Sequence, residues 1–179
     1  MQVITKAKQK IMKRIFLLAI PAFLMFIGCT KNDPITFDGT QVEFDAATWN
    51  ANAAGLTYPI MTRVPTMGAA TNTSQPLITR TSGTIQIRIN LVGAHRSSDA
   101  QFKYQVVALE STAVEGTHYT ALPGTGTIPA NSSFGMISIP ILNPGATSGS
   151  RVLVLQLVDN SDLKANFNYS KVGLSIAQN

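Results

Sequence analysis

The chain has 179 residues, with 14 Lys and Arg, nine Asp and Glu, and a single cysteine. Five of the bases and none of the acids lie in residues 1–28, so removing that segment leaves nine bases against nine acids. This neutral balance argues against nucleic acid as a partner, because such partners favour a basic surface. A single cysteine also excludes an internal disulfide framework and a cysteine-ligated metal site.

Residues 1–28 have the layout of an export signal. A basic segment without acids precedes thirteen apolar positions, Ile15 to Ile27, which are too few for a bilayer span of about 20 residues. The end of this segment, Phe26-Ile27-Gly28-Cys29, resembles the lipobox of bacterial lipoproteins. The resemblance implies that residues 1–28 are a cleaved signal peptide and that Cys29 is lipidated. The alternative is a permanent anchor helix with an incidental Cys29.

Residues 29–40 are polar and contain the turn pairs Asp33-Pro34 and Asp38-Gly39. We predict a lipidated tether that joins the membrane to a folded domain, since two or more acyl chains make anchoring stable. By resemblance to lipoprotein sorting, Thr30 lacks the aspartate that retains such proteins at the inner membrane. We therefore expect outer-membrane attachment with the domain on the cell surface; a periplasm-facing domain is the alternative.

From Gln41 onward the apolar residues alternate with polar ones, which predicts half-buried strands. The alternation covers residues 41–45, 84–91, 101–106, 137–141 and 172–176. Val152 to Val158 is almost entirely apolar, which predicts a strand covered on both faces. Pro140 would remove a ladder hydrogen bond from a central strand, so its strand belongs at an edge.

Residues 46–83 show no regular period. A structureless loop of this length is uncommon in a compact domain, so we predict short strands near residues 56–61 and 77–81. No window of helical length has a sustained amphipathic period. The pattern of short strands and turns predicts an all-β fold, a β-sandwich of about seven to nine strands over residues 41–179.

Three segments carry a family resemblance: 112–119 (TAVEGTHY), 126–131 (GTIPAN) and 137–141 (ISIPI). Together they resemble the Calx-beta domain, and the Calx-beta-like domains of unknown function found on Gram-negative surface lipoproteins. The resemblance implies an immunoglobulin-like sandwich in which Tyr119 is a buried corner tyrosine. It also implies an accessory role beside outer-membrane nutrient-uptake systems or adhesins.

Calx-beta domains of the calcium-regulated kind bind the ion through clustered carboxylates, and most of these positions differ here. His118 replaces an aspartate, Asn143-Pro144 replaces an acidic pair, and residues 148–150 replace glutamates. Calcium takes six to eight oxygen ligands, and the carboxylate of Glu115 alone supplies too few of them. We therefore expect no metal and no cofactor.

The residues that commonly perform catalysis show no recognisable arrangement. His95 lies in a polar loop and is expected to be solvated, while His118 is expected to cap a turn. The serine pairs lack the surrounding glycines of a nucleophile elbow. Glu43 and Asp45 share one face of a strand, and we expect that face to be solvated. We predict that the protein is not an enzyme.

Aromatic residues in the loop-rich N-terminal third are the candidates for ligand binding. Trp49, Tyr58 and Phe37 could form a platform for a sugar or a peptide, because aromatic side chains combine rigid area with a polar group. The alternative is that they cap the end of the sandwich. We expect a non-enzymatic surface lipoprotein that serves as a binding or adhesion accessory of an uptake or attachment complex.

An alternative function is assembly into an envelope complex by β-strand addition, which requires a long, unprotected edge strand. The binding function instead predicts an exposed aromatic residue on a concave surface.

Overall fold

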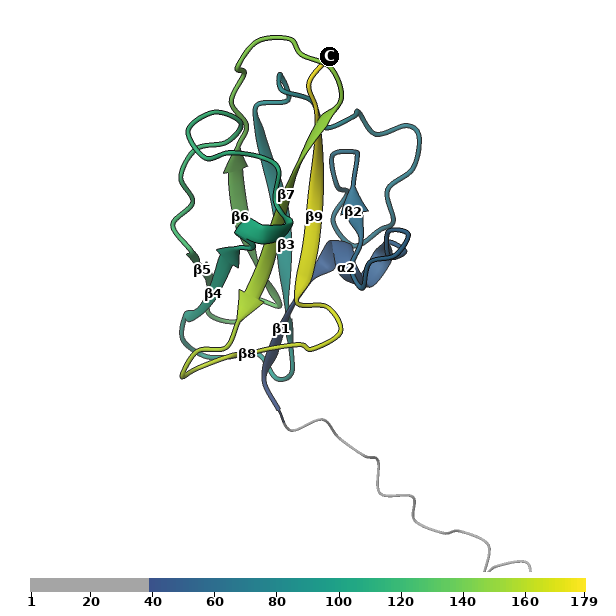
Figure 1. Ribbon diagram of the computed structural model, residues 1–179. Helices are drawn as coiled ribbons and strands as arrows, with labels where there is room; N and C mark the ends of the chain where they lie inside the picture. The colour runs from purple at the N-terminus through teal and green to yellow at the C-terminus, as the bar shows by residue number, and fades with distance from the viewer. Residues whose placement is uncertain (1–38) are drawn as a thin grey trace, which may run out of the picture. The chain divides into compact units, whose positions relative to one another are not determined.

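The computed structural model describes residues 39–179, which form two β-sheets packed face to face (Figure 1). The predicted signal peptide, Phe37, the lipidation site Cys29 and most of the tether lie outside the described residues. The first sheet has the order β6-β3-β1-β8, with β1 at Gln41–Phe44, β3 at Thr84–Val92, β6 at Phe134–Pro140 and β8 at Lys164–Ala165. The second has the order β2-β9-β7-β4-β5, with β2 at Ile60–Met61, β4 at Ala100–Val106, β5 at Thr125–Ile128, β7 at Ser150–Val158 and β9 at Lys171–Ala177.

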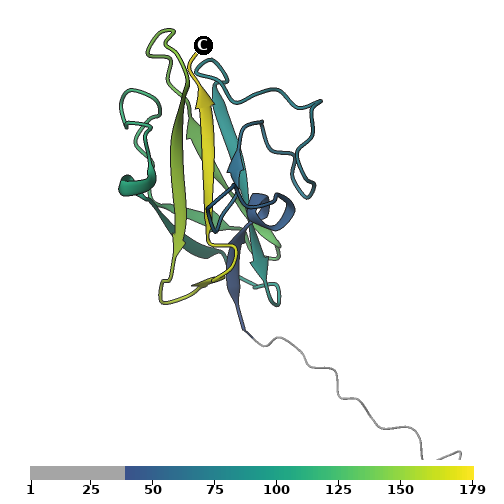
Figure 2. The ribbon, with the colours of Figure 1, turned by 45° about the vertical axis from the view of Figure 1, so that its right-hand side comes forward.

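The two sheets enclose a single apolar core (Figure 2). Strand β3 shows why the chain folds this way: Ile85, Ile87 and Ile89 point into the core, while the alternate residues face outward. Strand β6 of the same sheet, and strands β4 and β9 of the facing sheet, also direct alternate residues into the core. The prediction of an all-β sandwich is therefore confirmed.

Two strands confirm more specific predictions. In β7 three consecutive residues, Leu153 to Leu155, are fully buried, as a strand covered on both faces requires. Strand β6 lies at the edge of its sheet and ends at Pro140, so the missing N–H of the proline interrupts no central ladder. Tyr119 is buried, as the Calx-beta resemblance implied.

The crossover at residues 46–83 is only partly as predicted. Strand β2 lies inside the range 56–61, whereas residues 77–81 make isolated bridges through Leu77 and Thr79 instead of a strand. The chain also forms a five-residue helix, α2, at Asp45–Trp49 and one 3-10 turn, η1, at Ala108–Glu110. No helix within residues 39–179 is long and apolar enough to cross a membrane.

Three of the four sheet edges in the described part of the chain are short, and the fourth, β6, is bonded at its two ends. β2 and β8 have two residues each and β5 has four. β6 has seven, but the carbonyl of Pro140 accepts the N–H of Thr120 at 3.0 Å, and Ser132 Oγ bonds both backbone groups of Phe134. These edges give the alternative of strand addition no support.

Candidate functional site

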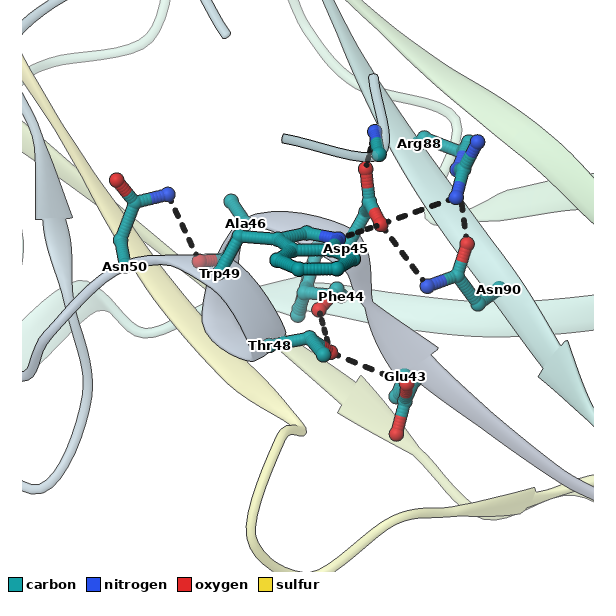
Figure 3. Close-up of polar contacts among 10 residues, drawn as sticks. Glu43, Phe44, Asp45, Ala46, Thr48, Trp49, Asn50, Arg88 and Asn90 are labelled. Carbon is teal, nitrogen blue, oxygen red and sulfur yellow. Dashed lines mark hydrogen bonds and ion pairs between the residues drawn. The ribbon is translucent and has the colours of Figure 1, made fainter. Parts of the chain in front are cut away.

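A buried carboxylate organises the outer side of the first sheet. We call Asp45 and the four residues that bond it, Trp49, Gly68, Arg88 and Asn90, the Asp45 cluster (Figure 3). One oxygen of Asp45 accepts Trp49 Nε1 and Asn90 Nδ2 at 3.0 Å and pairs with Arg88 at 3.2 Å. The other accepts the backbone N–H of Gly68 at 2.7 Å. Asp45 therefore ties α2, the crossover and β3 together.

The prediction that Glu43 and Asp45 face solvent is wrong. Glu43 is 8% exposed and Asp45 is 3% exposed. Glu43 accepts Thr48 Oγ1 at 3.1 Å and Asn166 Nδ2 at 3.0 Å. Alternation identified the side of β1 on which Glu43 lies, but the β8–β9 loop covers that side. Asp45 begins α2 instead of continuing the strand, and the crossover covers it through Gly68. Burial of the two acids is tolerated because each has hydrogen-bond partners.

Trp49 lies on the surface, with 49% of its area exposed. Its indole N–H is held by Asp45, so the ring has a fixed orientation. Arg88, which bonds the same oxygen of Asp45, places its guanidinium over the exposed ring of Phe134, 5.2 Å from the ring centroid. Trp49 thus meets the predicted requirement of exposure, although it does not line the surface hollows of about 590 and 410 Å³.

Tyr58 is buried, with 5% exposure, so Trp49 and Tyr58 do not form a common exposed platform. Its hydroxyl donates to Glu110 at 2.6 Å, and Lys171 lies 5.1 Å above its ring and donates to the same carboxylate at 2.8 Å. Burial, followed by the hydrogen bond and charge of Glu110, raises the pKa of Tyr58 to about 12. The hydrogen bond from Lys171, and then that from Tyr58, lowers the pKa of Glu110.

The concave surface lies immediately beside Tyr58. A hollow of about 590 Å³, which we call the aromatic groove, is formed by the segment before β2, the β8–β9 loop and the start of β9. In both ribbon views the segment after α2 (blue) lies next to the start of β9 (yellow) (Figures 1 and 2). Its lining residues are Asn52, Leu56, Thr57, Gln156, Phe167, Asn168, Tyr169, Ser170 and Lys171.

The loop that carries the two aromatic residues of the groove is fixed at both ends. Asn166 donates its backbone N–H to Val42 at 2.9 Å and its side chain to Glu43. The carbonyl of Tyr169 accepts the N–H of Phe44 at 2.9 Å. Between these anchors Phe167 is 94% exposed. The fold thus holds a large apolar ring in solvent on a well-anchored loop.

The two histidines have ordinary hydrogen bonds. His118 Nδ1 accepts the N–H of Val114 at 3.0 Å, which confirms the predicted turn cap. His95 is exposed, as predicted, and its Nε2 lies 2.6 Å from Ser133 Oγ. Among the described residues no carboxylate bonds His95, so the pair lacks the third group that orients a base.

Within residues 39–179 no three or more His, Cys, Asp or Glu side chains converge as metal ligands would. Glu115 lies in the turn that ends at Tyr119. The charge of Glu115, after burial, raises the pKa of Tyr119.

Sequence reasoning did not identify the aromatic groove. The signal that could have found it is Phe167-Asn168-Tyr169, in which two aromatic residues are separated by one residue inside a polar turn. Apolar rings at that position have no strand or helix to bury them, which is typical of recognition loops. Tyr58 indicated the right neighbourhood, because Leu56 and Thr57 line the groove.

Comparisons with known proteins identify the fold. A model of a domain of unknown function (DUF4843) matches residues 76–176, more than half of the chain. The crystal structure of the apo form of the Calx CBD1 domain is similar at a TM-score of 0.50 and 12% identity, over 78% of this chain and 98% of that domain. The Calx CBD2 domain gives 0.47 and 14% identity, over 56% and 80%. CBD12 from CALX1.2 gives 0.46 and 16%, over 55% of this chain and 40% of that one. No curated protein matches the chain.

Proposed function

Because the chain belongs to the family described as a domain of unknown function (DUF4843), and its sandwich is Calx-beta-like, we propose that it is a non-enzymatic, lipid-anchored binding protein of the bacterial outer membrane. In this proposal residues 1–28 are the signal peptide and Cys29 carries the lipid. The sandwich faces the cell exterior and serves a nutrient-uptake or attachment complex as a binding or adhesion accessory.

The observation that carries the binding function is the aromatic groove. Its volume of about 590 Å³ lies within the roughly 300–1,000 Å³ of small-molecule sites. Leaving Phe167 in solvent forgoes the roughly 1.5–3 kcal/mol that burial of such a side chain contributes. A ring kept exposed by anchors on both sides is pre-organised for a partner, which lowers the entropy cost of binding.

The location is supported by the sequence of the first 29 residues, and its test is protease accessibility on intact cells. The wild-type protein is expected in the membrane fraction and is cleaved by external protease. Cys29→Ala is expected to be unprocessed or soluble. A wild-type protein that is membrane-bound but protected places the domain in the periplasm, and a wild-type protein that fractionates as soluble contradicts the anchor.

The binding role is tested in cells that lack the protein. A double variant, Phe167→Ala with Tyr169→Ala, is expected to reach wild-type surface levels and still fail to restore attachment to, or growth on, extracellular polymers. Leu109→Ala, which truncates a fully exposed side chain outside the groove, is the matched control. Full restoration by the double variant contradicts a role for the groove.

A further inference from the structure

The chemistry of the aromatic groove is specific enough to indicate the class of its ligand. The groove combines three features: exposed apolar rings, unengaged amide groups and a balanced charge. Each feature excludes some ligands.

The rings of Phe167 and Tyr169 supply flat apolar surface. Both are exposed, and both line the groove. Flat rings bind apolar faces rather than isolated polar groups, and the C–H face of a sugar ring is such a surface. The hydroxyl of Tyr169 adds a polar group at the edge of the contact.

Amide side chains supply hydrogen-bonding groups around those rings. Asn52, Gln156 and Asn168 line the groove, and none of the side-chain hydrogen bonds within residues 39–179 involves their amide groups. Asn168 donates only its backbone N–H, to the side chain of Asn166. An amide offers both donors and acceptors, which matches hydroxyl groups that are themselves both. Thr57 and Ser170 add hydroxyls to the same lining.

The charge of the groove is balanced. Lys171 is the only charged residue in the lining, and Glu110 neutralises it at 2.8 Å. A polyanion such as a uronic acid polymer would find no free cation here, and a cationic peptide would find no free acid. Charge complementarity therefore favours an uncharged ligand.

The backbone around the groove argues against an extended peptide. A peptide that adds to a sheet needs free backbone N–H and C=O groups along one wall. Gln156 and Lys171 are opposite each other in the β7–β9 ladder, and the carbonyl of Ser170 accepts Leu157 N at 2.8 Å. The side of the groove formed by β7 and β9 therefore presents side chains to a ligand, because its backbone N–H and C=O groups are already bonded between the two strands.

We infer that the aromatic groove binds a neutral oligosaccharide, with Phe167 and Tyr169 stacked on the apolar faces of its sugar rings. This inference rests on the proposed binding function and adds the ligand class. The amides of Asn52, Gln156 and Asn168 bond the sugar hydroxyls.

The test is affinity electrophoresis of the full-length lipoprotein in detergent micelles. Native gels contain one neutral polysaccharide each, either dextran, galactomannan, xyloglucan or laminarin, and a parallel gel contains polygalacturonate. At least one neutral polymer is expected to retard the wild-type protein. Phe167→Ala is expected to weaken that binding about tenfold or more, the scale of truncating a central aromatic contact. Leu109→Ala is the control, and circular dichroism checks that each variant is folded.

Three results overturn the inference. Retardation by polygalacturonate alone rejects a neutral ligand, and no retardation in any gel rejects a polysaccharide ligand. Loss of retardation in Trp49→Ala but not in Phe167→Ala moves the site to the Asp45 cluster. None of these results affects membrane attachment, so fractionation separates a failure of this inference from a failure of the proposed location.

Discussion

The Asp45 cluster and the aromatic groove both carry exposed aromatic residues, yet they are built in opposite ways. In the Asp45 cluster the ring of Trp49 is bonded directly to a buried carboxylate. In the groove the ring of Phe167 has no polar anchor of its own, and only the backbone on either side is held. The first region contributes chiefly to stability, and the second leaves its side chains free to meet a partner.

The two regions depend on two acids that are separated by a single residue in the chain. Asp45 holds the crossover through Gly68, whereas Glu43 holds the groove loop through Asn166. The difference teaches which exposed aromatic residue is the better candidate for binding. It is the one whose flanking backbone is held by hydrogen bonds while its own side chain makes none. Four substitutions test this distinction.

Asp45→Asn is expected to have the largest effect on stability. It keeps the shape but removes the charge that pairs with Arg88, and breaking a buried pair costs about 3–5 kcal/mol. Urea denaturation measures the loss. Asp159→Asn, at an exposed carboxylate that pairs with Lys164 at 3.1 Å, is the matched control and is expected to cost far less, because solvent screens that pair. Equal losses in the two variants would remove the structural role of the Asp45 cluster.

Asn166→Ala is expected to cost about 1–3 kcal/mol, because it removes a hydrogen-bond donor from the buried carboxylate of Glu43. It also removes one of the two bonds that hold this end of the groove loop and leaves the backbone bond to Val42, so glycan binding should weaken although no lining residue has changed. Asn168→Ala is the control for stability, since its side chain bonds no other described residue. A stable Asn166→Ala protein with unchanged binding would show that the loop needs no anchor.

Tyr58→Phe is expected to change the pH dependence of stability more than stability itself. The folded state raises the pKa of Tyr58 to about 12, above the ordinary value of 10.0, so it holds this proton more tightly than the unfolded state. The contribution of this proton to the free energy of unfolding is fully present below pH 10 and is lost as the pH rises toward 12. An ultraviolet titration should show one late-ionising tyrosine fewer in Tyr58→Phe. An ultraviolet titration that is the same in Tyr58→Phe and in the wild-type protein would contradict this prediction.

Phe167→Ala is expected to have the smallest effect on stability, within about 0.5 kcal/mol, because the ring packs against little of the protein. Its effect on binding is the tenfold loss described above. Urea denaturation and affinity electrophoresis of the same preparation compare the two quantities. A destabilisation as large as that of Asn166→Ala would mean that the ring is a structural element, and the contrast between the two regions would fail.

The sequence predicted most of the sandwich because most of its strands can be recognised from the pattern of their own residues. The alternation in β3 and the apolar run of β7 reflect which faces are buried, and Pro140 reflects an edge. The site was predicted less well: Trp49 is exposed as expected, whereas Tyr58 is buried and the rings of the groove come from the other end of the chain.

By itself the sequence determined the longer strands, the fold class and the turn-capping role of His118, because each depends on residues close together in the chain. Its first 29 residues are also the basis for the proposed lipid anchor. Only the tertiary structure decided that Glu43 and Asp45 are buried and that Asn52 and Phe167 line one groove. These facts depend on which distant segments cover a strand, and alternation along one strand carries no information about what lies over its outer face.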